Sequence, residues 1–294
     1  RPPRSTLEWN RRQRQMCIRD RVSGQWSRLF EEPLFEGEGE RNAYPLGPVQ
    51  GADGLFHVVW VWRETSDCAT NHHLSYCRSR DLKQWETASG DPLQLPITLS
   101  DVKTWVDPIP VQGGIINGCQ TLAFDAKERP MISYHKLDEN GAMQIYIARF
   151  EASRWRIQPI TTWQKNITFS GRGAMPFIGI RIGELVRVQP GVLAISYRHR
   201  DYGSGHISLD ESTLRPLDRP IKVIPEYPTQ LHKPTLQFAG ISVRLAHDKN
   251  QLSDAQTKYV LRWETLPANH DRPRVPPLPP ASTLELVKMR RVDK

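Results

Sequence analysis

The sequence has no apolar run long enough to cross a membrane, and it has very few cysteines. Its longest apolar stretch, His57–Trp62 (HVVWVW), falls far short of the roughly 20 residues that a membrane-spanning helix needs. The 294 residues include four cysteines and no C-x-x-C pair, which argues against a disulfide framework and a zinc ribbon. Cys68 and His72 are of residue types that bind metals, so the sequence leaves open whether a structural metal ion is bound and does not assign its ligands. We therefore expect no membrane span and no assignable metal or cofactor.

Positive charge is concentrated at one end of the chain. Residues 1–21 hold seven Arg against Glu8 and Asp20, a net charge of +5, which leaves +3 for Val22–Lys294. This leader has neither apolar periodicity nor the apolar region and small-residue cleavage site of a signal peptide. We interpret it as non-native or disordered. The rest of the chain is too close to neutral to argue for a nucleic-acid partner, and we expect none.

A pattern of strand, turn, strand and acidic turn recurs along the chain. The strands are five to nine residues long and rich in β-branched and aromatic residues, and no window shows a sustained helical period. The first strand of each copy is His57–Arg63, Met131–Lys136, Val192–Arg200 or Ile241–Ala246. This pattern predicts an all-β fold over residues 22–294, a single-domain β-propeller of about four to five blades, each a four-stranded antiparallel sheet.

Acidic residues stand in three of the turns. Asp81, Glu151 and Asp210 lie 70 and 59 residues apart, a spacing that fits one propeller blade with a loop insertion. A carboxylate in such a turn accepts hydrogen bonds from backbone N–H groups, and the Trp four residues after it packs between blades. We interpret these acids as structural rather than catalytic.

The segment Ser79–Trp85 (SRDLKQW) resembles an Asp-box, the BNR repeat of sialidase-like propellers, with Lys83 where glycine is usual. Longer stretches resemble a BNR-repeat family related to seven-bladed propeller polysaccharide lyases, which act on ulvan and on rhamnose–glucuronate linkages. These stretches are Arg41–Arg63, Cys68–Trp85, Ile132–Asp138 and Tyr259–Pro267.

The resemblance implies a carbohydrate-active protein that acts on, or binds, acidic uronate-containing polysaccharide or oligosaccharide, with β-elimination as the leading activity. In such lyases a base removes the proton next to the uronate carboxylate, and a cation neutralises that carboxylate. The alternatives are a sialidase-like glycoside hydrolase, which needs a carboxylate pair or a Tyr–Glu pair, and a non-catalytic glycan-binding propeller. The sequence leaves the compartment open, and for the intact protein we expect secretion or a periplasmic location.

The sequence departs from this family pattern at its beginning. The histidine motifs that the resemblance implies on early blades would lie upstream of Trp26, where only the leader stands. We therefore expect an N-terminally truncated member of a seven-bladed ring. A complete five-bladed propeller is the alternative.

Candidate site residues are taken from the ends of the strands expected to be innermost. Cations recur there, which predicts a basic ring suited to an anionic sugar; the alternative is that charged strand ends simply meet solvent. The candidates for substrate binding are Arg63, Tyr134, His135, Lys136, Arg198 and Arg200. The candidates for catalysis are Tyr44 and Arg63, which echo the Tyr/Arg pair implied by the resemblance, together with His72 and His135.

Overall fold

The structure is a computed structural model that describes residues 15–16, 19–22, 25–29, 32–218, 221, 227–247 and 257–290. The described residues divide into two compact units. The first runs up to Ile221 and leaves out Gly173–Pro176, and the second joins these four residues to the segments that follow Ile221. The predicted leader, residues 1–21, lies largely outside the described residues. Its described parts are two short strands.

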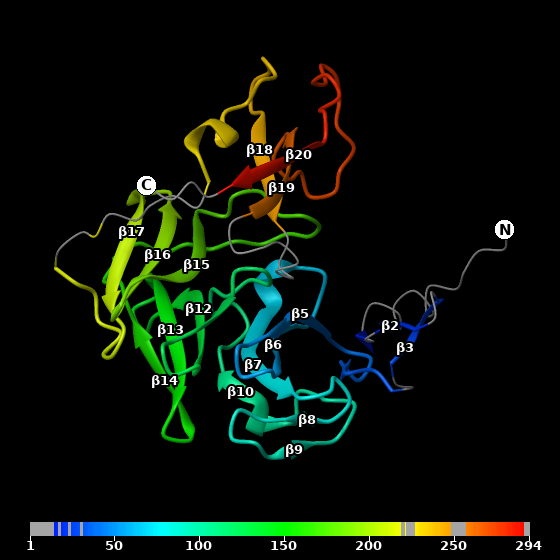
Figure 1. Cartoon of the computed structure of the whole chain (residues 1–294), viewed down its shortest axis with the longest axis vertical. Helices are drawn as coiled ribbons and strands as arrows, with labels where there is room; N and C mark the ends of the chain where they lie inside the picture. Colours follow the sequence, from blue (N-terminus) through cyan, green and yellow to red (C-terminus); the bar gives the residue numbers. More distant parts are fainter. Residues whose placement is uncertain are drawn as a thin grey trace. The chain divides into compact units, whose positions relative to one another are not determined.

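The first unit contains three main antiparallel sheets (Figure 1). The first sheet has the order β5(Asn42–Gln50), β6(Phe56–Arg63), β7(Asn71–Ser79), β8(Trp85–Glu86) and β9(Pro92–Leu93), with β10(Trp105–Asp107) also paired to β7. The second is β11(Thr121–Phe124), β12(Pro130–Leu137), β13(Met143–Glu151) and β14(Arg154–Pro159). The third is β15(Ile180–Gln189), β16(Val192–His199) and β17(Gly203–Asp210).

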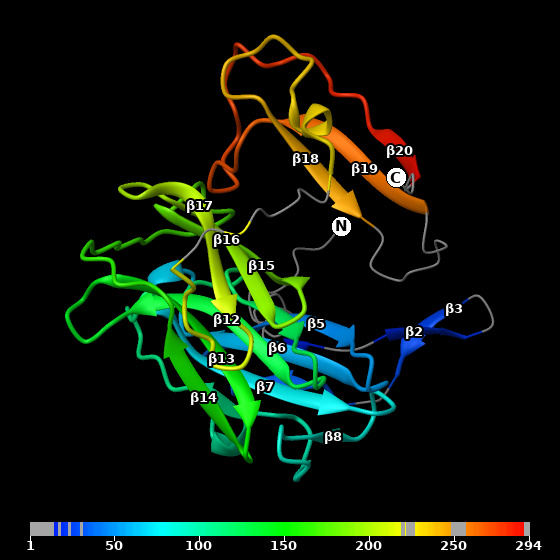
Figure 2. The same ribbon diagram turned by 60° about the vertical axis from the view of Figure 1, so that its left-hand side comes forward.

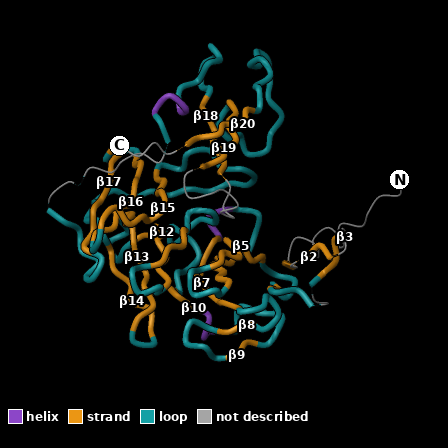
Figure 3. Tube along the Cα trace, in the orientation of Figure 1, coloured by secondary structure: helices purple, strands orange, loops and turns teal. Residues whose placement is uncertain are grey.

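Smaller elements complete the described chain. Two ribbons pair β1(Gln15–Met16) with β4(Phe35–Glu36) and β2(Arg19–Val22) with β3(Gln25–Arg28). The second unit holds the sheet β18(Ser242–His247), β19(Thr257–Thr265) and β20(Glu285–Arg290). The helical turns are η1(Cys68–Thr70), η2(Val102–Thr104) and η3(Thr229–His232), all of them short (Figure 3). Within the described residues, no helix has the length and apolar character that a bilayer crossing requires.

The second sheet is packed on both faces, between the first and third sheets (Figures 1 and 2). Alternation along β13 points Tyr146 and Ala148 into a core shared with the first sheet, while Ile145 and Ile147 enter a core shared with the third. Trp155 of β14 also meets the first sheet, with its ring centroid 5.2 Å from that of Tyr76. Successive antiparallel sheets packed face to face in this way form a partial β-propeller, as the sequence predicts.

The first sheet buries aromatic residues on its other face. Trp60, Trp62 and Trp85 pack there with Phe35, all essentially shielded from solvent. At about 1.5–3 kcal/mol for each large apolar side chain removed from water, these aromatic residues are a main source of stability for this sheet.

One expectation about the blades is wrong. The strands β6, β12 and β16 were expected to be innermost, but each lies second in its sheet, inside an edge strand. The edge strand of the first sheet, β5, contains Pro45 and Pro48, residues that lack a backbone N–H and are tolerated only where one side of a strand is free. Because proline has a low β propensity, these two residues also keep the strand from being predicted from the sequence.

The acidic turns have structural roles. Asp81 Oδ1 accepts hydrogen bonds from the backbone N–H groups of Lys83 and Gln84, both at 2.8 Å, as the sequence predicts. Asp210 Oδ1 likewise accepts from the Thr213 N–H at 2.8 Å. Glu151 acts differently, because its carboxylate binds arginines in place of backbone groups.

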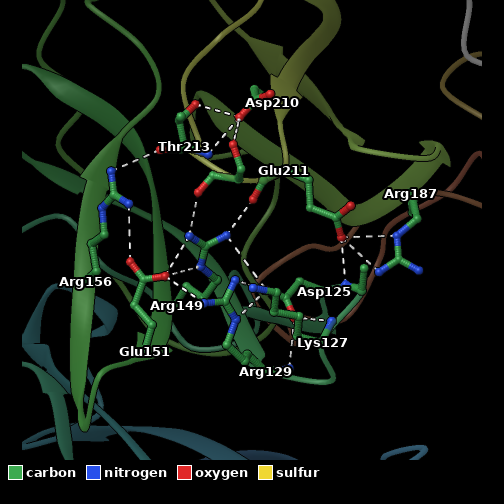
Figure 4. Close-up of polar contacts among 12 residues, drawn as sticks. Asp125, Lys127, Arg129, Arg149, Glu151, Arg156, Arg187, Asp210, Glu211 and Thr213 are labelled. Atoms are coloured by element: carbon green, nitrogen blue, oxygen red, sulfur yellow. Dashed lines mark hydrogen bonds and ion pairs between the residues drawn. The ribbon is translucent and has the colours of Figure 1, made fainter.

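Those arginines belong to a network that joins the second and third sheets (Figure 4). Arg149 is buried; it donates to the Glu211 carbonyl oxygen at 2.5 Å, to the Ser212 carbonyl oxygen at 2.8 Å, and to the Glu151 carboxylate at 3.0 Å. The side chain of Glu211, which follows β17, also contacts the turn between β11 and β12, where its Oε1 accepts from the Ala126 backbone N–H at 2.8 Å. The contact between these two sheets is therefore polar as well as apolar.

Candidate functional site

A β-bulge places two adjacent histidines side by side at one end of the first sheet. Between β6 and β7, Val61 pairs with Leu74 but Trp62 pairs with His72, so His73 is the extra residue. Its φ of 46° lies in the left-handed region that a non-glycine residue rarely adopts. Bulges of this kind redirect a side chain, and they are over-represented next to active sites.

The two imidazoles are linked to each other and to a carboxylate. His72 Nδ1 lies 2.6 Å from His73 Nδ1, and His72 Nε2 lies 2.8 Å from Glu64 Oε1. The angles at the second contact do not make a hydrogen bond, but the charge of the carboxylate favours a donor there, so we assign a proton to His72 Nε2. His72 Nδ1 then accepts from His73 Nδ1–H. This assignment leaves His73 Nε2 with a lone pair, and it has no hydrogen-bond partner among the described residues.

Both histidines are held neutral near pH 7. Burial, followed by the charge of His73, lowers the pKa of His72 to about 4. Burial also lowers the pKa of His73, although the charges of Glu64 and Asp107 act in the opposite direction. A neutral imidazole with an open nitrogen is able to accept a proton.

An acid, a cation and an aromatic ring lie beside the histidines. Asp107, whose charge acts on His73, has an Oδ2 atom 2.6 Å from Lys136 Nζ and 2.5 Å from Tyr134 Oη. Lys136 is partly exposed, whereas Tyr134 is fully buried. The Trp105 ring centroid lies 4.5 Å from that of His73. We call Glu64, His72, His73, Asp107 and Lys136 the histidine cluster.

Arg63, a candidate from the sequence, is buried and holds a loop. Its Nε donates to the carbonyl oxygens of Thr65 at 3.0 Å and Asp67 at 3.2 Å, and its Nη2 donates to the Ser66 carbonyl oxygen. Its guanidinium carbon lies 5.5 Å from the ring centroid of Tyr44, so the structure does bring these two candidates together.

The remaining candidates lie apart from the histidine cluster in their contacts. His135 is buried, and its Nδ1 lies 2.8 Å from the Gly114 carbonyl oxygen. On the third sheet, the guanidinium carbon of Arg198 lies 4.5 Å from the Phe177 ring centroid. Arg200 donates to the Asn166 carbonyl oxygen at 2.8 Å and to Asp201 at 3.1 Å.

Sequence reasoning found His72 and Lys136 but missed Glu64, His73 and Asp107 as partners. The pair His72–His73 interrupts the alternation of a strand, which is a weak signal for a bulge. No sequence signal places Asp107, because it reaches the cluster through the pairing of β10 with β7.

Metal ligands do not gather in the part of the chain that the structure describes. Within the described ranges, no group of three or more His, Cys, Asp or Glu side chains is arranged to hold a metal ion.

Comparisons with known proteins identify a family and a fold. The family model described as a BNR repeat-containing family member matches residues 6–163, more than half of the chain. Among curated proteins, no match was found. Two solved structures of an ulvan lyase of polysaccharide lyase family PL25, one bound to -[GlcA(1-4)Rha3S]-, are similar with a TM-score of 0.51 and 14% identity.

The similarity covers 83% of this chain and 54% of the ulvan lyase, so the chain spans about half the length of that protein. At 14% identity it shows a shared fold. A xylan β-1,4-xylosidase from Bacillus halodurans is similar with a TM-score of 0.39 and 13% identity, over 86% of this chain and 45% of that enzyme.

Proposed function

This chain belongs to the BNR repeat-containing family, and we propose that it cleaves a uronate-containing polysaccharide by β-elimination at the histidine cluster. The observation that carries the proposal is the contact between His72 and His73 at the bulge, with Glu64 beside them; the tautomer assigned above leaves Nε2 of His73 open. The fold shared with an ulvan lyase supports the same class of substrate.

The chemistry assigns one role to each end of the cluster. His73 Nε2 takes the proton from the sugar carbon next to the carboxylate, and the electrons of that C–H bond form the new C=C bond. The glycosidic C–O bond breaks, and its oxygen receives the proton back from His73 in a syn elimination. General base catalysis of this kind typically contributes about 10²–10⁴-fold in rate.

Lys136 supplies the positive charge that the substrate carboxylate needs. It is the partly exposed cation of the cluster, and Asp107 holds its Nζ in place. Arg63 suits this role less well, because its donors already bind the loop that it supports. The half-buried Trp105 ring beside His73 offers a flat surface for an apolar face of a sugar.

The test is to incubate the protein with ulvan and other uronate polymers and to follow the ultraviolet absorbance of the unsaturated uronate product. His73→Asn is the variant to compare, because Asn tolerates the left-handed backbone at this position. We expect its rate to fall by about 100-fold or more. The matched control is His206→Asn, which changes an exposed histidine on β17 and keeps the rate.

Two outcomes contradict the proposal. Reducing ends that accumulate without the ultraviolet signal indicate a hydrolase. Binding of the polymer with neither signal indicates a glycan-binding module. The Tyr–carboxylate pair formed by Tyr134 with Asp107 of the cluster gives the hydrolase little support, because Tyr134 is inaccessible to solvent.

A further inference from the structure

Cys119 stands opposite His135 at the beginning of the second sheet. The strands β11 and β12 pair antiparallel, with Thr121 opposite Ser133 and Leu122 opposite Ile132. The paired residues end at Thr121, and Cys119 lies in the loop two residues before it, on the side of β11 where His135 stands in β12. The thiol and the imidazole lie close enough there to affect each other's pKa.

The Gly114 carbonyl oxygen sets the orientation of the imidazole. It lies 2.8 Å from His135 Nδ1 and accepts the proton of that nitrogen, so Nε2 is the nitrogen that faces the thiol. Gly114 has a φ of +86°, and a Cβ added there would lie 2.9 Å from the backbone N of Leu137. Glycine is therefore required where the chain presents this carbonyl. A cysteine, a histidine and an acceptor in this order form the arrangement of an activated thiol.

The pKa of the Cys119 thiol is lowered and that of the His135 imidazole is raised, so the two values move toward each other. Burial raises the pKa of the Cys119 thiol, but the charge of His135 and hydrogen bonds outweigh it and leave the pKa below its ordinary value. Burial lowers the pKa of His135, but Cys119 and the Gly114 carbonyl outweigh it and leave that pKa raised. At Cys68 and Cys77 the largest effect is burial, and the pKa of each thiol is raised.

Exposure also separates Cys119 from these two cysteines. Cys119 is partly exposed, with its side chain packed against the core between the first and second sheets, whereas Cys68 and Cys77 are buried. A thiolate reacts with an electrophile only where the electrophile reaches it.

We propose that Cys119 and His135 form a thiolate–imidazolium pair, and that Cys119 is a site of covalent modification by soft electrophiles such as alkyl halides and peroxides. Neither residue belongs to the histidine cluster, so the proposal stands whether or not the protein is a lyase.

The modification steps follow the ordinary chemistry of a thiolate. With iodoacetamide, sulfur attacks the CH₂ carbon, a C–S bond forms, the C–I bond breaks and iodide leaves with the electron pair. With hydrogen peroxide as the oxidant, sulfur attacks one oxygen, the O–O bond breaks, hydroxide leaves and Cys119 becomes a sulfenic acid. In both steps the proton stays on His135, which then exchanges it with solvent.

The experiment measures the rate of iodoacetamide alkylation of the folded protein between pH 5.5 and about 9, with peptide mass spectrometry assigning each site. An ordinary thiol reacts about tenfold faster for each pH unit below its pKa of about 8.5. We expect the Cys119 rate to change by less than about threefold between pH 6.5 and 8.5, because a thiolate is already present. Cys68 and Cys77 serve as internal controls and stay unmodified until the protein unfolds.

A rate at Cys119 that rises about tenfold per pH unit overturns the proposal, and so does a folded protein in which Cys119 does not react. His135→Gln, checked for a native thermal transition, is expected to restore the ordinary rise with pH. If that variant does not fold, the pH dependence of the Cys119 alkylation rate in the unaltered protein still tests the proposal. The absorbance of the thiolate, lost in Cys119→Ser and retained in Cys68→Ser, gives a second measurement that needs no reagent.

Discussion

Nε2 of His72 lies 2.8 Å from Oε1 of Glu64, and the tautomers that we assign to His72 and His73 depend on this ion-pair contact. With a proton assigned to His72 Nε2, the proton of His73 lies on Nδ1, and Nε2 of His73 is left open. Arg41 Nε donates to the same Glu64 oxygen at 3.1 Å and helps to hold it. A surface carboxylate thus acts on the proposed base through an intervening imidazole.

Glu64→Gln is expected to slow β-elimination by about tenfold, because an amide no longer enforces the His72 tautomer. Glu64 raises the pKa of His73, so removing its charge lowers that pKa. The acid limb of the pH–rate profile is then expected to move to lower pH. Glu86→Gln is the control, since Glu86 pairs with Arg78 on the same sheet and away from the histidines. A pH–rate profile that stays in place in Glu64→Gln argues against an effect of Glu64 on His73.

Protonation of His72 is expected to destabilise the folded state at acidic pH. Its pKa is about 4 when folded, against about 6.5 when unfolded, so the folded state binds fewer protons between these values. The free energy of unfolding should be intact above pH 6.5 and fall toward pH 4, by on the order of 3 kcal/mol from this residue. Urea titrations of His72→Asn should show a shallower loss than the unaltered protein. Parallel curves contradict this expectation.

Lys136→Met is expected to raise KM for uronate polymers by about tenfold, because the variant keeps the apolar stem near Tyr146 but loses the charge. Binding of a neutral oligosaccharide should change much less. Lys127→Met is the matched control, since Lys127 is an exposed lysine in the turn between β11 and β12. Equal KM values for the two variants argue against Lys136 as the carboxylate partner.

Arg149→Met is expected to lower the free energy of unfolding by about 3–5 kcal/mol, because the Glu151 carboxylate and two carbonyl oxygens of the turn after β17 lose a buried donor. Arg156 binds the same carboxylate at 3.2 Å but is well exposed, so Arg156→Met should cost about 1 kcal/mol or less. Urea unfolding of both variants measures the difference. Similar losses in the two variants run against this assignment.

Asp81→Ala is expected to cost about 1 kcal/mol of stability, through loss of the hydrogen bonds to Lys83 and Gln84. The rate of polymer cleavage should stay unchanged, since Asp81 lies in a turn after β7 and binds only its own segment. Thermal melting and the ultraviolet assay check the two parts. Loss of activity in a stably folded variant contradicts the structural role.

The sequence predicts the strands of the fold better than their order. Near-continuous apolar runs identify β6, β12 and β16, because both faces of these strands are buried and leave a strong signal. The edge strands β5, β11 and β15 were missed. Proline, a short length or a glycine weakens their signal, and an edge strand tolerates all three.

The residues of the candidate site also differ in whether the sequence identifies them. His72 and Lys136 were identified from the sequence, and Arg63 was too, although its donors turn out to bind a loop. Glu64 and Asp107 carry no pattern that distinguishes them from other acids. Their roles depend on which side chains a bulge and a cross-sheet contact bring near.

What the sequence alone determines here is local: the alternation that makes strands, the Asp81 turn, and the residues that mark a BNR-type protein. What only the tertiary structure decides is which nitrogen or sulfur atom is open to react. That property depends on partners far apart in the chain, as Cys119 with His135 and Asp107 with Lys136 show. Proton positions follow from distances of a few ångströms, and a linear sequence does not contain those distances.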